Sequence, residues 1–245
     1  MLPLKIFIIN LLSSTTRREA MVSRMGELGC DFEIFKAVDG RSNPHPLFQR
    51  YDDRLRLKAR RRALSGGELG CWASHFLLWQ RCVDIDRPIV VMEDDVSIDD
   101  NFIEALSIAS EQLGHLKYLR LAGTSLHRRS YQLVDQIGSF SLADHVRGPS
   151  GTLCYVIHPE AAQALIKHSS SWFLAVDDYI DRYWIHGVDC YSLMPFPVTI
   201  PCFPGDIERL EKKKINLYWK LRQEIFRRAD RFRRFCYRRA KIRPS

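Results

Sequence analysis

The stretch Val90-Val-Met-Glu-Asp-Asp95 joins an apolar run to three consecutive carboxylates. An apolar run of this kind, bounded by polar residues, is typical of a strand that is buried on both faces. Because side chains alternate along a strand, we expect Glu93 and Asp95 to point one way and Asp94 the other. Adjacent carboxylates repel one another unless a positive charge lies nearby. The stretch therefore predicts a buried strand with a charged site at its end.

This acidic triplet favours a metal site. Two hard oxygen ligands at the spacing of Glu93 and Asp95 suit Mg²⁺ or Mn²⁺, and these ions usually also bind substrate phosphates. We therefore expect metal-assisted chemistry on a phosphorylated donor. The alternative is an acidic loop that follows an edge strand and binds nothing.

The composition is ordinary for a soluble globular protein, since 46% of the residues are apolar and 27% are charged. A chain of 245 residues can form one large α/β domain or two small ones. The seven cysteines are scattered without a CxxC pair, which favours buried free thiols in a reducing compartment. No signal peptide is evident, and no apolar stretch approaches the roughly 18 residues of a membrane helix. We expect a soluble, cytoplasmic body.

The apolar patterns predict an α/β fold that begins with a parallel sheet. A strand at residues 5–9, a helix that stops at Gly29 and a strand at residues 31–38 form a βαβ unit. Residues 41–64 are interpreted as irregular and basic. The other expected elements are a helix from a glycine-rich entry at 64–75 to about Val83, strands at 89–92 and 118–121, a helix at 101–113, a strand before Pro159, helices at 159–166 and 175–184, and an extended segment at 195–204.

A second acidic pair, Asp177-Asp178, stands at an expected helix start. Transfer of a sugar or a phosphate requires a base that takes the proton of the attacking hydroxyl, and a positioned carboxylate can do so. Acidic residues are also favoured at a helix start by N-capping and by the positive end of the helix dipole. Both interpretations stay open for this pair.

Two further segments could contact an anion. The glycine-rich Gly66-Gly-Glu-Leu-Gly70 can bring backbone amides close to an anion at a helix start, although it lacks the lysine of a P-loop. His75 lies farther along this helix, where a histidine is more often packed or capping than a ligand. Arg17-Arg18 follows the first strand, where an open α/β sheet binds ligands, and guanidinium groups suit a diphosphate. A solvated pair at a helix start is the alternative for these arginines.

The basic charge of the chain lies in its carboxyl-terminal part. Residues 205–245 contain 15 Lys and Arg against 5 Asp and Glu, a balance of +10, whereas the whole chain carries +8 and residues 1–204 therefore carry −2. Apolar residues recur every three or four positions between residues 208 and 239, which predicts a basic amphipathic helix that binds an anionic membrane surface. RNA is the competing partner, but no nucleic-acid-binding module accompanies this helix, so no nucleic acid is expected.

Several short motifs follow one another along the chain: Phe7-Ile-Ile-Asn-Leu11, Arg17-Arg-x-x-Met21, Phe35-x-Ala-Val-Asp-Gly40, Leu64-Ser-Gly-Gly-Glu-Leu-Gly-Cys-x-x-Ser-His75, Ile89-Val-Val-Met-Glu-Asp-Asp-Val96, Tyr155-Val-Ile-x-Pro159 and Val176-Asp-Asp178. In this order and spacing they resemble glycosyltransferase family 25, the bacterial lipooligosaccharide and lipopolysaccharide sugar transferases related to collagen galactosyltransferases. The resemblance covers roughly residues 4–205.

The resemblance implies a GT-A-type fold, in which a Rossmann-like α/β sheet binds a nucleotide-sugar. It also implies inverting transfer of a hexose from a UDP-sugar, often UDP-galactose, to a lipid-linked oligosaccharide. On this basis residues 1–205 form the catalytic domain. Residues 206–245 form the basic helical tail, which we expect to lie on the cytoplasmic face of the inner membrane.

Carried onto this sequence, the resemblance gives Glu93-x-Asp95 the role of the metal-binding DxD motif, with Asp95 as the main ligand of Mn²⁺ or Mg²⁺. The candidate contacts to the donor nucleotide are Asn10, Arg18, Asp39, His75, Glu93 and Asp94. The candidate catalytic bases are Asp178 or Asp177, with Glu68 in reserve.

Two other classes of function compete with this interpretation. A metal-dependent phosphohydrolase or nucleotidyltransferase would also use clustered carboxylates, but it would release inorganic phosphate or pyrophosphate. A non-enzymatic membrane- or RNA-binding module would use the basic tail alone. The donor sugar, the acceptor and the linkage cannot be read from these residues.

Overall fold

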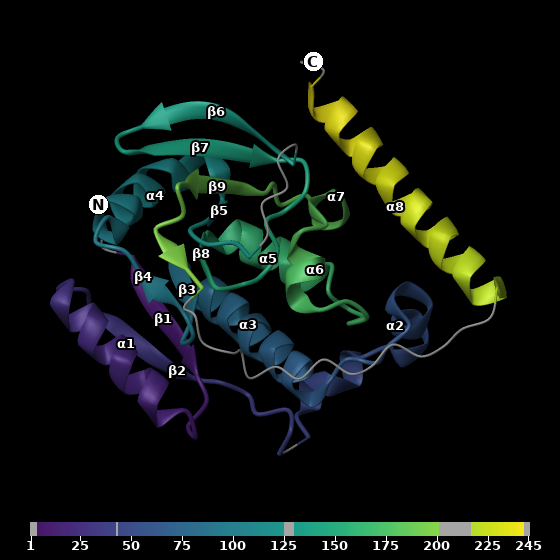
Figure 1. Cartoon of the computed structure of the whole chain (residues 1–245), viewed down its shortest axis with the longest axis horizontal. Coiled ribbons are helices and arrows are strands. Elements are labelled where there is room, and N and C mark those ends of the chain that lie inside the picture. Colours follow the sequence, from purple (N-terminus) through teal and green to yellow (C-terminus); the bar gives the residue numbers. More distant parts are fainter. Residues whose placement is uncertain (1–3, 43, 125–129, 201–216, 243–245) are drawn as a thin grey trace.

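The computed structural model describes residues 4–42, 44–124, 130–200 and 217–242. These residues form one eight-stranded mixed sheet with helices on both faces, and a two-stranded sheet beside it (Figure 1). The strand order in the large sheet is β2-β1-β3-β8-β5-β9-β7-β6. The α/β class predicted from the sequence is confirmed.

The amino-terminal third is the predicted βαβ unit. Strand β1 (Lys5–Asn10) pairs in parallel with β2 (Phe32–Lys36) on one side and with β3 (Ile89–Glu93) on the other. Helix α1 (Thr15–Glu27) connects β1 to β2, and Gly29 adopts a φ of +64° after it. That left-handed conformation is easily adopted by glycine, which explains the helix stop at this position.

The sheet becomes antiparallel beyond β3. Strand β8 (Cys154–Ile157) runs antiparallel to both β3 and β5 (Tyr118–Arg120), and β5 is parallel to β9 (Tyr191–Met194). The hairpin of β6 (Tyr131–Ile137) and β7 (Phe140–His145) forms the far edge. The carboxyl ends of β1, β3 and β5 therefore lie on the same side of the sheet.

The sheet separates two hydrophobic cores, and β3 contributes to both. Val90 and Met92 pack on the face covered by α1 and α4 (Phe102–Leu116), whereas Ile89 and Val91 pack on the opposite face. That opposite face is covered by α3 (Gly66–Asp84), α5 (Pro159–Lys167) and α6 (Val176–Ile180). The prediction of a strand buried on both faces is confirmed.

The glycines at the start of α3 allow close packing of two backbones. A Cβ atom on Gly70 would lie 2.3 Å from the carbonyl oxygen of Val38, and one on Gly66 would lie 2.5 Å from that of Gly40. Helix α3 can thus contact the segment that follows β2 only if these positions lack side chains. The glycines bring the helix start to the carboxyl end of β2.

The interpretation of residues 41–64 as irregular is wrong. They contain a short 3-10 helix at Pro46–Arg50 and helix α2 (Asp53–Arg60). The side chain of Asp52 caps α2 by accepting a hydrogen bond from the amide of Leu55, and Arg56 and Ala59 are buried. With only two buried positions in a largely basic sequence, α2 lacks the apolar periodicity that identifies a helix.

The predicted helix at 175–184 is interrupted. It consists of α6 and of α7 (Tyr183–His186), with Asp181 and Arg182 between them. The segment expected to be extended includes β10 (Val198–Thr199), which pairs with β4 (Ser97–Ile98), and its end lies outside the described residues. The six described cysteines have free thiols, as predicted, but only Cys82, Cys154 and Cys190 among them are buried.

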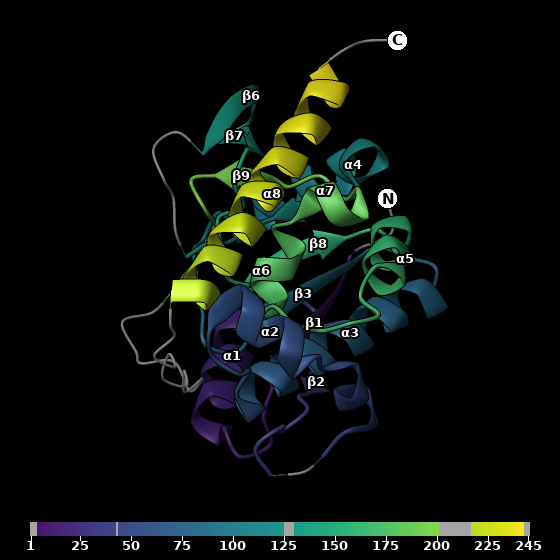
Figure 2. The same cartoon turned by 90° about the vertical axis from the view of Figure 1, so that its right-hand side faces the viewer.

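The basic tail contains one long helix, α8 (Leu217–Ile242), which crosses the molecule beside α2 and α7 (Figures 1 and 2). The amide of Gln223 donates to the carbonyl oxygen of Ala59, and Arg182 forms an ion pair with Asp230. Residues 201–216, which contain the predicted domain boundary and the expected start of this helix, lie outside the described part. Within that part, no helix combines the length and apolar character needed to cross a membrane.

We predict that Gly70→Ala lowers the free energy of unfolding by about 1–3 kcal/mol, because the new methyl group would overlap the backbone of residue 38. Gly114→Ala is the matched control: it also lies in a helix, but nothing lies within 4 Å of its Cβ position. The free energy of unfolding of that control should rise by up to about 1 kcal/mol, because alanine has a higher helix propensity than glycine. Urea unfolding of both variants measures the difference, and equal effects would contradict the close-packing role.

Candidate active site

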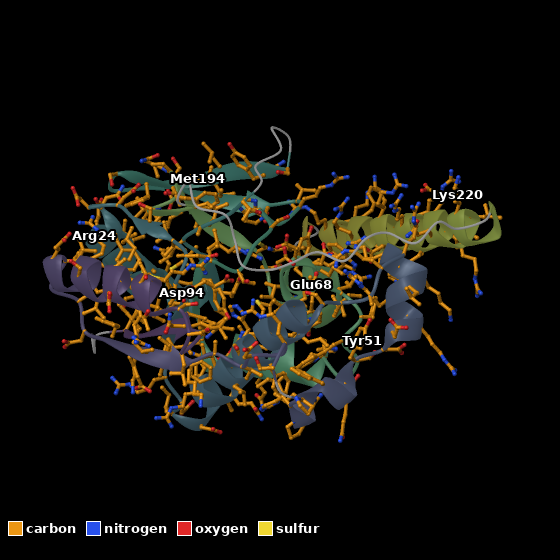
Figure 3. The ribbon with its side chains drawn as sticks, turned by 60° about the horizontal axis from the view of Figure 1, so that its bottom comes forward. Arg24, Tyr51, Glu68, Asp94, Met194 and Lys220 are labelled. Carbon is orange, nitrogen blue, oxygen red and sulfur yellow. The ribbon has the colours of Figure 1, made fainter. Side chains whose placement is uncertain are left out.

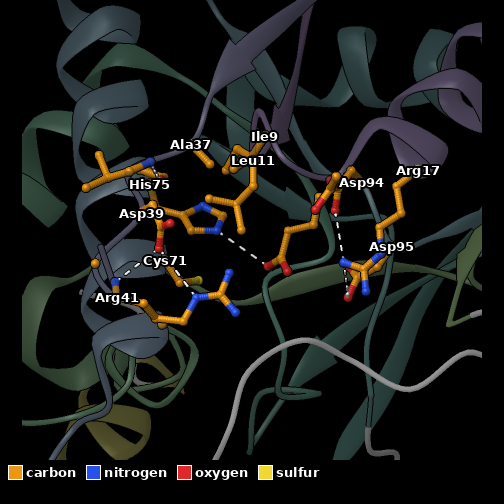
Figure 4. Close-up of a pocket in the computed structure, with 16 residues that line it drawn as sticks. Ile9, Leu11, Arg17, Ala37, Asp39, Arg41, Cys71, His75, Asp94 and Asp95 are labelled. Carbon is orange, nitrogen blue, oxygen red and sulfur yellow. Dashed lines mark hydrogen bonds and ion pairs between the residues drawn. The ribbon is translucent and has the colours of Figure 1, made fainter. Parts of the chain in front are cut away.

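A pocket opens at the carboxyl ends of β1 and β3, next to the amino-terminal half of α3 (Figure 4). It encloses about 650 Å³ of empty space, part of which is open to solvent. Its lining residues are Ile9, Leu11, Ser14, Arg17, Ala37, Val38, Asp39, Gly40, Arg41, Gly67, Cys71, Ser74, His75, Glu93, Asp94 and Asp95. The whole acidic triplet is therefore at this pocket.

The triplet does not keep the alternation of a strand. Strand β3 ends at Glu93, and the chain bends at Asp94 and Asp95. A guanidinium nitrogen of Arg17 lies 3.4 Å from Asp94 Oδ1 and 4.0 Å from Asp95 Oδ2. Asp94 and Asp95 thus approach the same cation, whereas Glu93 contacts His75 of α3, and all three carboxylates line the pocket. In Figure 4 the two aspartates and Arg17 lie opposite His75.

Asp95 is the carboxylate best placed to bind a cation. Burial, followed by the charge of Glu93, raises its pKa to about 6 despite the opposing effect of Arg17. Its Oδ1 atom is buried and has no hydrogen-bond partner among the described residues. A buried acceptor without a partner costs free energy, and a bound divalent cation would remove that cost. The donor set of the pocket therefore fits a hard metal ion.

Asn10 fixes the position of Asp94. Its amide nitrogen donates to Asp94 Oδ2 at 2.6 Å and to the carbonyl oxygen of Ser14 at 3.0 Å, and its side chain is buried. Burial raises the pKa of Asp94, while the bond from Asn10 and the charge of Arg17 act against the increase. Asn10 supports the acidic triplet from behind and is not among the residues that line the pocket.

Glu93 is held by residues of two other elements. Thr152 donates its hydroxyl to Glu93, and Nε2 of His75 lies 3.5 Å from the same carboxylate. Burial would raise the pKa of Glu93, but the contacts with His75 and Thr152 and the positive charge of Arg120 together lower it. The contacts of this largely buried carboxylate therefore favour its ionised form.

The segment after β2 forms the other rim of the pocket. Asp39 accepts hydrogen bonds from the hydroxyl of Ser42 and from the backbone amide of Arg41, and these bonds lower its pKa. Asp39 and His75 both line the pocket, as does Arg41, which the sequence reasoning had not singled out. Arg18 does not line it, whereas its neighbour Arg17 does. Arg41 could have been found, since it follows the turn at the carboxyl end of β2.

Glu68 is engaged at the start of α3. It completes a capping box with Ser65 and accepts two hydrogen bonds from Arg62, at 2.6 and 2.8 Å. Arg56 lies 3.8 Å away, and the side chain of Glu68 is buried. Burial would raise its pKa, but the bonds from Arg62 and Ser65 lower it. Glu68 joins α2 to α3 and does not line the pocket.

The second acidic pair adjoins the first site through a buried arginine. Arg120, at the end of β5, donates to Asp181 at 2.6 Å and contacts the backbone of Gly151, whose amide donates to Asp177. Burial raises the pKa of Asp181 to about 6, against the effect of Arg120. Burial and the neighbouring Asp178 raise the pKa of Asp177. The sequence reasoning missed Arg120 and Asp181.

Asp178 faces a different space from the pocket of Figure 4. It forms an ion pair with Arg60 of α2 at 3.0 Å and lines a polar cleft of about 1300 Å³ between the body and α8. The other lining residues are Arg60, Arg147, Gly148, Ser150, Leu174, Asp181, Arg182, Trp184, Glu224, Phe226, Arg227, Asp230, Arg231 and Arg234. In Figure 3, the label Glu68 marks the start of α3 and the label Lys220 marks α8. Helix α8 therefore forms one wall of a cleft that carries a candidate base.

Comparison with known proteins matches most of the chain to the family that its sequence motifs resemble. Residues 3–180 match the family described as "Glycosyltransferase family 25 (LPS biosynthesis protein)". The lipooligosaccharide biosynthesis protein lic2B of Haemophilus influenzae is 33% identical over 96 residues, which cover 39% of this chain and 35% of that protein. Procollagen galactosyltransferase 2 of Homo sapiens is 29% identical over 188 residues, which cover 72% of this chain and 29% of that protein.

Some relatives are named as inactive members of the same family. Inactive glycosyltransferase 25 family member 3 of Mus musculus is 25% identical over 238 residues, which cover 88% of this chain and 40% of that protein. The chain thus spans well under half of the length of these three relatives. The family match covers more than half of the chain and includes β1, the start of α3 and the acidic triplet. The chain belongs to glycosyltransferase family 25.

Proposed function

We propose that this chain is an inverting glycosyltransferase of GT-A type that moves a hexose from a UDP-sugar to a lipooligosaccharide or lipopolysaccharide acceptor. Galactose is the favoured hexose, because a relative is named as a galactosyltransferase, and another is named for lipooligosaccharide biosynthesis. The observation that carries the proposal is the buried Oδ1 atom of Asp95, which has no hydrogen-bond partner among the described residues and lies in a pocket at the carboxyl ends of parallel strands.

Asp95 and Glu93 would hold Mn²⁺ or Mg²⁺ in this proposal. When bound, the ion would neutralise the negative charge that develops on the departing diphosphate. Arg17 keeps Asp94 and Asp95 together despite their like charges, and Asn10 restrains Asp94. The protein thus prepares the acidic triplet before any ligand arrives, so less ordering is needed when the donor binds.

The rim after β2 is the proposed contact for the rest of the donor. Asp39 and Arg41 present a carboxylate and a guanidinium on the same turn, and Leu11 and Val38 add apolar surface. A carboxylate accepts bonds from ribose hydroxyls, a guanidinium binds phosphate oxygens, and an apolar wall suits the base. These residues support a nucleoside diphosphate as the ligand.

Asp178 is our first choice for the base that deprotonates the acceptor hydroxyl. Its side chain is 39% exposed in the polar cleft, whereas Asp177 is engaged by the backbone amides of Gly151 and Asp178. We place the acceptor in this cleft, where Arg60 would have to release Asp178 as the acceptor enters. We do not propose Glu68 as the base, because its carboxylate already accepts hydrogen bonds from Arg62 and from the backbone amide of Ser65.

We also propose that α8 binds an anionic membrane surface, on the cytoplasmic face of the inner membrane. Its side toward the body is engaged through residues such as Asp230 and Arg238. Its outer side exposes an apolar stripe that is 54–66% exposed at each position and is accompanied by arginines: Leu221, Ile225, Phe232 and Phe235. An apolar stripe with flanking basic residues is typical of helices that lie in a membrane interface.

Asp95→Asn should reduce Mn²⁺-dependent UDP release by on the order of 100-fold or more, since metal stabilisation of the leaving group contributes several kcal/mol. The measurement is UDP release across several UDP-sugars, with lipooligosaccharide acceptors present and absent. Asp31→Asn, an exposed carboxylate far along the chain from the triplet, is the matched control and should keep full turnover. Near-normal turnover of folded Asp95→Asn would refute the metal assignment. Release of inorganic phosphate by the wild-type chain would favour a phosphohydrolase.

Asp178→Asn should lower turnover by roughly 10²–10⁴-fold, the usual contribution of a general base, while UDP affinity stays unchanged. Turnover and UDP binding are measured on the same preparation, and Asp177→Asn serves as the comparison. Loss of UDP affinity in Asp178→Asn, with normal turnover at saturating donor, would place this carboxylate in the donor site instead.

Substituting both Leu221 and Phe232 by Glu should weaken binding to anionic vesicles at least about tenfold, because burial of each apolar side chain contributes about 1.5–3 kcal/mol. Leu133→Glu is the control, since it changes an equally exposed apolar residue on β6. Activity on a short soluble acceptor should not change. Vesicle binding that is equal in all these proteins would remove the membrane proposal.

A further inference from the structure

Three potential ligand atoms of different chemistry meet inside the pocket. The Sγ atom of Cys71, a ring nitrogen of His75 and a carboxylate oxygen of Glu93 all lie within 4.8 Å of one another. Cys71 and His75 are four residues apart on α3, so both project from one face of that helix, as Figure 4 shows. Glu93 reaches the same point from the end of β3. Two separate elements thus converge on one location.

His75 is oriented as metal-binding histidines usually are. Its Nδ1 lies 2.9 Å from the hydroxyl oxygen of Tyr155, which also accepts a bond from the indole of Trp79. With the ring proton on Nδ1, this oxygen fixes the ring and Nε2 presents its lone pair to the pocket. Nε2 is buried and makes no hydrogen bond within the described part of the chain, and it lies 3.5 Å from the carboxylate of Glu93, so a cation could bind between these two groups; His75 is 0% exposed.

The thiol of Cys71 is the third donor, since its Sγ atom lies within 4.8 Å of the ring nitrogen of His75 and the carboxylate oxygen of Glu93. Coordination of a thiol to a cation stabilises the thiolate and releases the thiol proton to solvent. A sulfur donor favours an ion with high affinity for sulfur.

We propose that Cys71, His75 and Glu93 form a site for Zn²⁺, with a fourth coordination position open to the pocket. Sulfur, imidazole and carboxylate together are a common donor set for zinc, whereas Mn²⁺ and Mg²⁺ prefer oxygen ligands such as Asp95. Glu93 is shared between this site and the hard-metal site of the proposed function. Glu93 bound to zinc would not be available to a metal ion at Asp95, so that occupation of one site opposes occupation of the other.

The test is a Co²⁺ titration of the full chain, because cobalt replaces zinc and its bond to a thiolate gives a charge-transfer absorption band. We expect one Co²⁺ per chain with this band. Cys71→Ser should abolish the band and weaken Zn²⁺ binding at least about tenfold, measured by competition with a chromophoric chelator. Cys236→Ser, which removes an exposed thiol on α8, should keep both the band and the affinity.

Circular dichroism and the melting temperature show whether Cys71→Ser is folded, and Cys71→Ala provides a second variant if it is not. A band that persists without Cys71, or Zn²⁺ affinities that are equal with and without this thiol, would overturn the proposal. The titration requires neither UDP nor an acceptor. It therefore fails or succeeds independently of the glycosyltransferase proposal.

Discussion

The buried guanidinium of Arg120 is the charge on which the acidic centre of this protein depends. It is 1% exposed, it pairs with Asp181, and its positive charge opposes the pKa increases that burial causes at Asp177, Asp181 and Glu93. Several carboxylates withdrawn from water would otherwise repel one another at the ends of neighbouring strands. Because a buried charge that loses its partner is strongly destabilising, Arg120 fixes the relative position of the two acidic groups.

The strand order of the mixed sheet also determines where the polar side chains of the candidate site lie. Parallel pairing of β1, β2 and β3 brings Asn10, Asp39 and the triplet to one edge, and β5 delivers Arg120 to the same edge across the intervening β8. The glycine contacts between α3 and the segment after β2 then place Cys71 and His75 against that edge. The pocket of Figure 4 thus lies at these strand ends, whereas the polar cleft near Asp178 lies toward α8.

The parts that the sequence predicted are those encoded by local patterns. The apolar run before Glu93, the stop at Gly29 and the glycine-rich start of α3 each carry their signal within a few residues. The hairpin β6–β7 was missed, since Leu133 and Val134 of β6 face solvent and the alternation in that strand is weak, although β7 contributes the buried Phe140 and Leu142. The orientation of Asp94 and Asp95, the pairing of Glu68 with Arg62 and the role of Arg120 depend on contacts between distant segments. No pattern in a single sequence records such contacts. A relative named as inactive aligns with 88% of the chain, so membership of the family does not by itself establish activity.

The proposed function requires a divalent cation at the acidic triplet when the diphosphate of the donor binds. Calorimetric titration of the wild-type chain with UDP, once with Mn²⁺ and once with a chelator, tests this most directly. We predict one UDP per chain and an affinity that falls at least about tenfold when the metal is removed, since the ion offsets the repulsion between the diphosphate and the carboxylates. UDP binding of equal strength with and without metal, or no binding in either case, would contradict a metal-dependent UDP site at the acidic triplet.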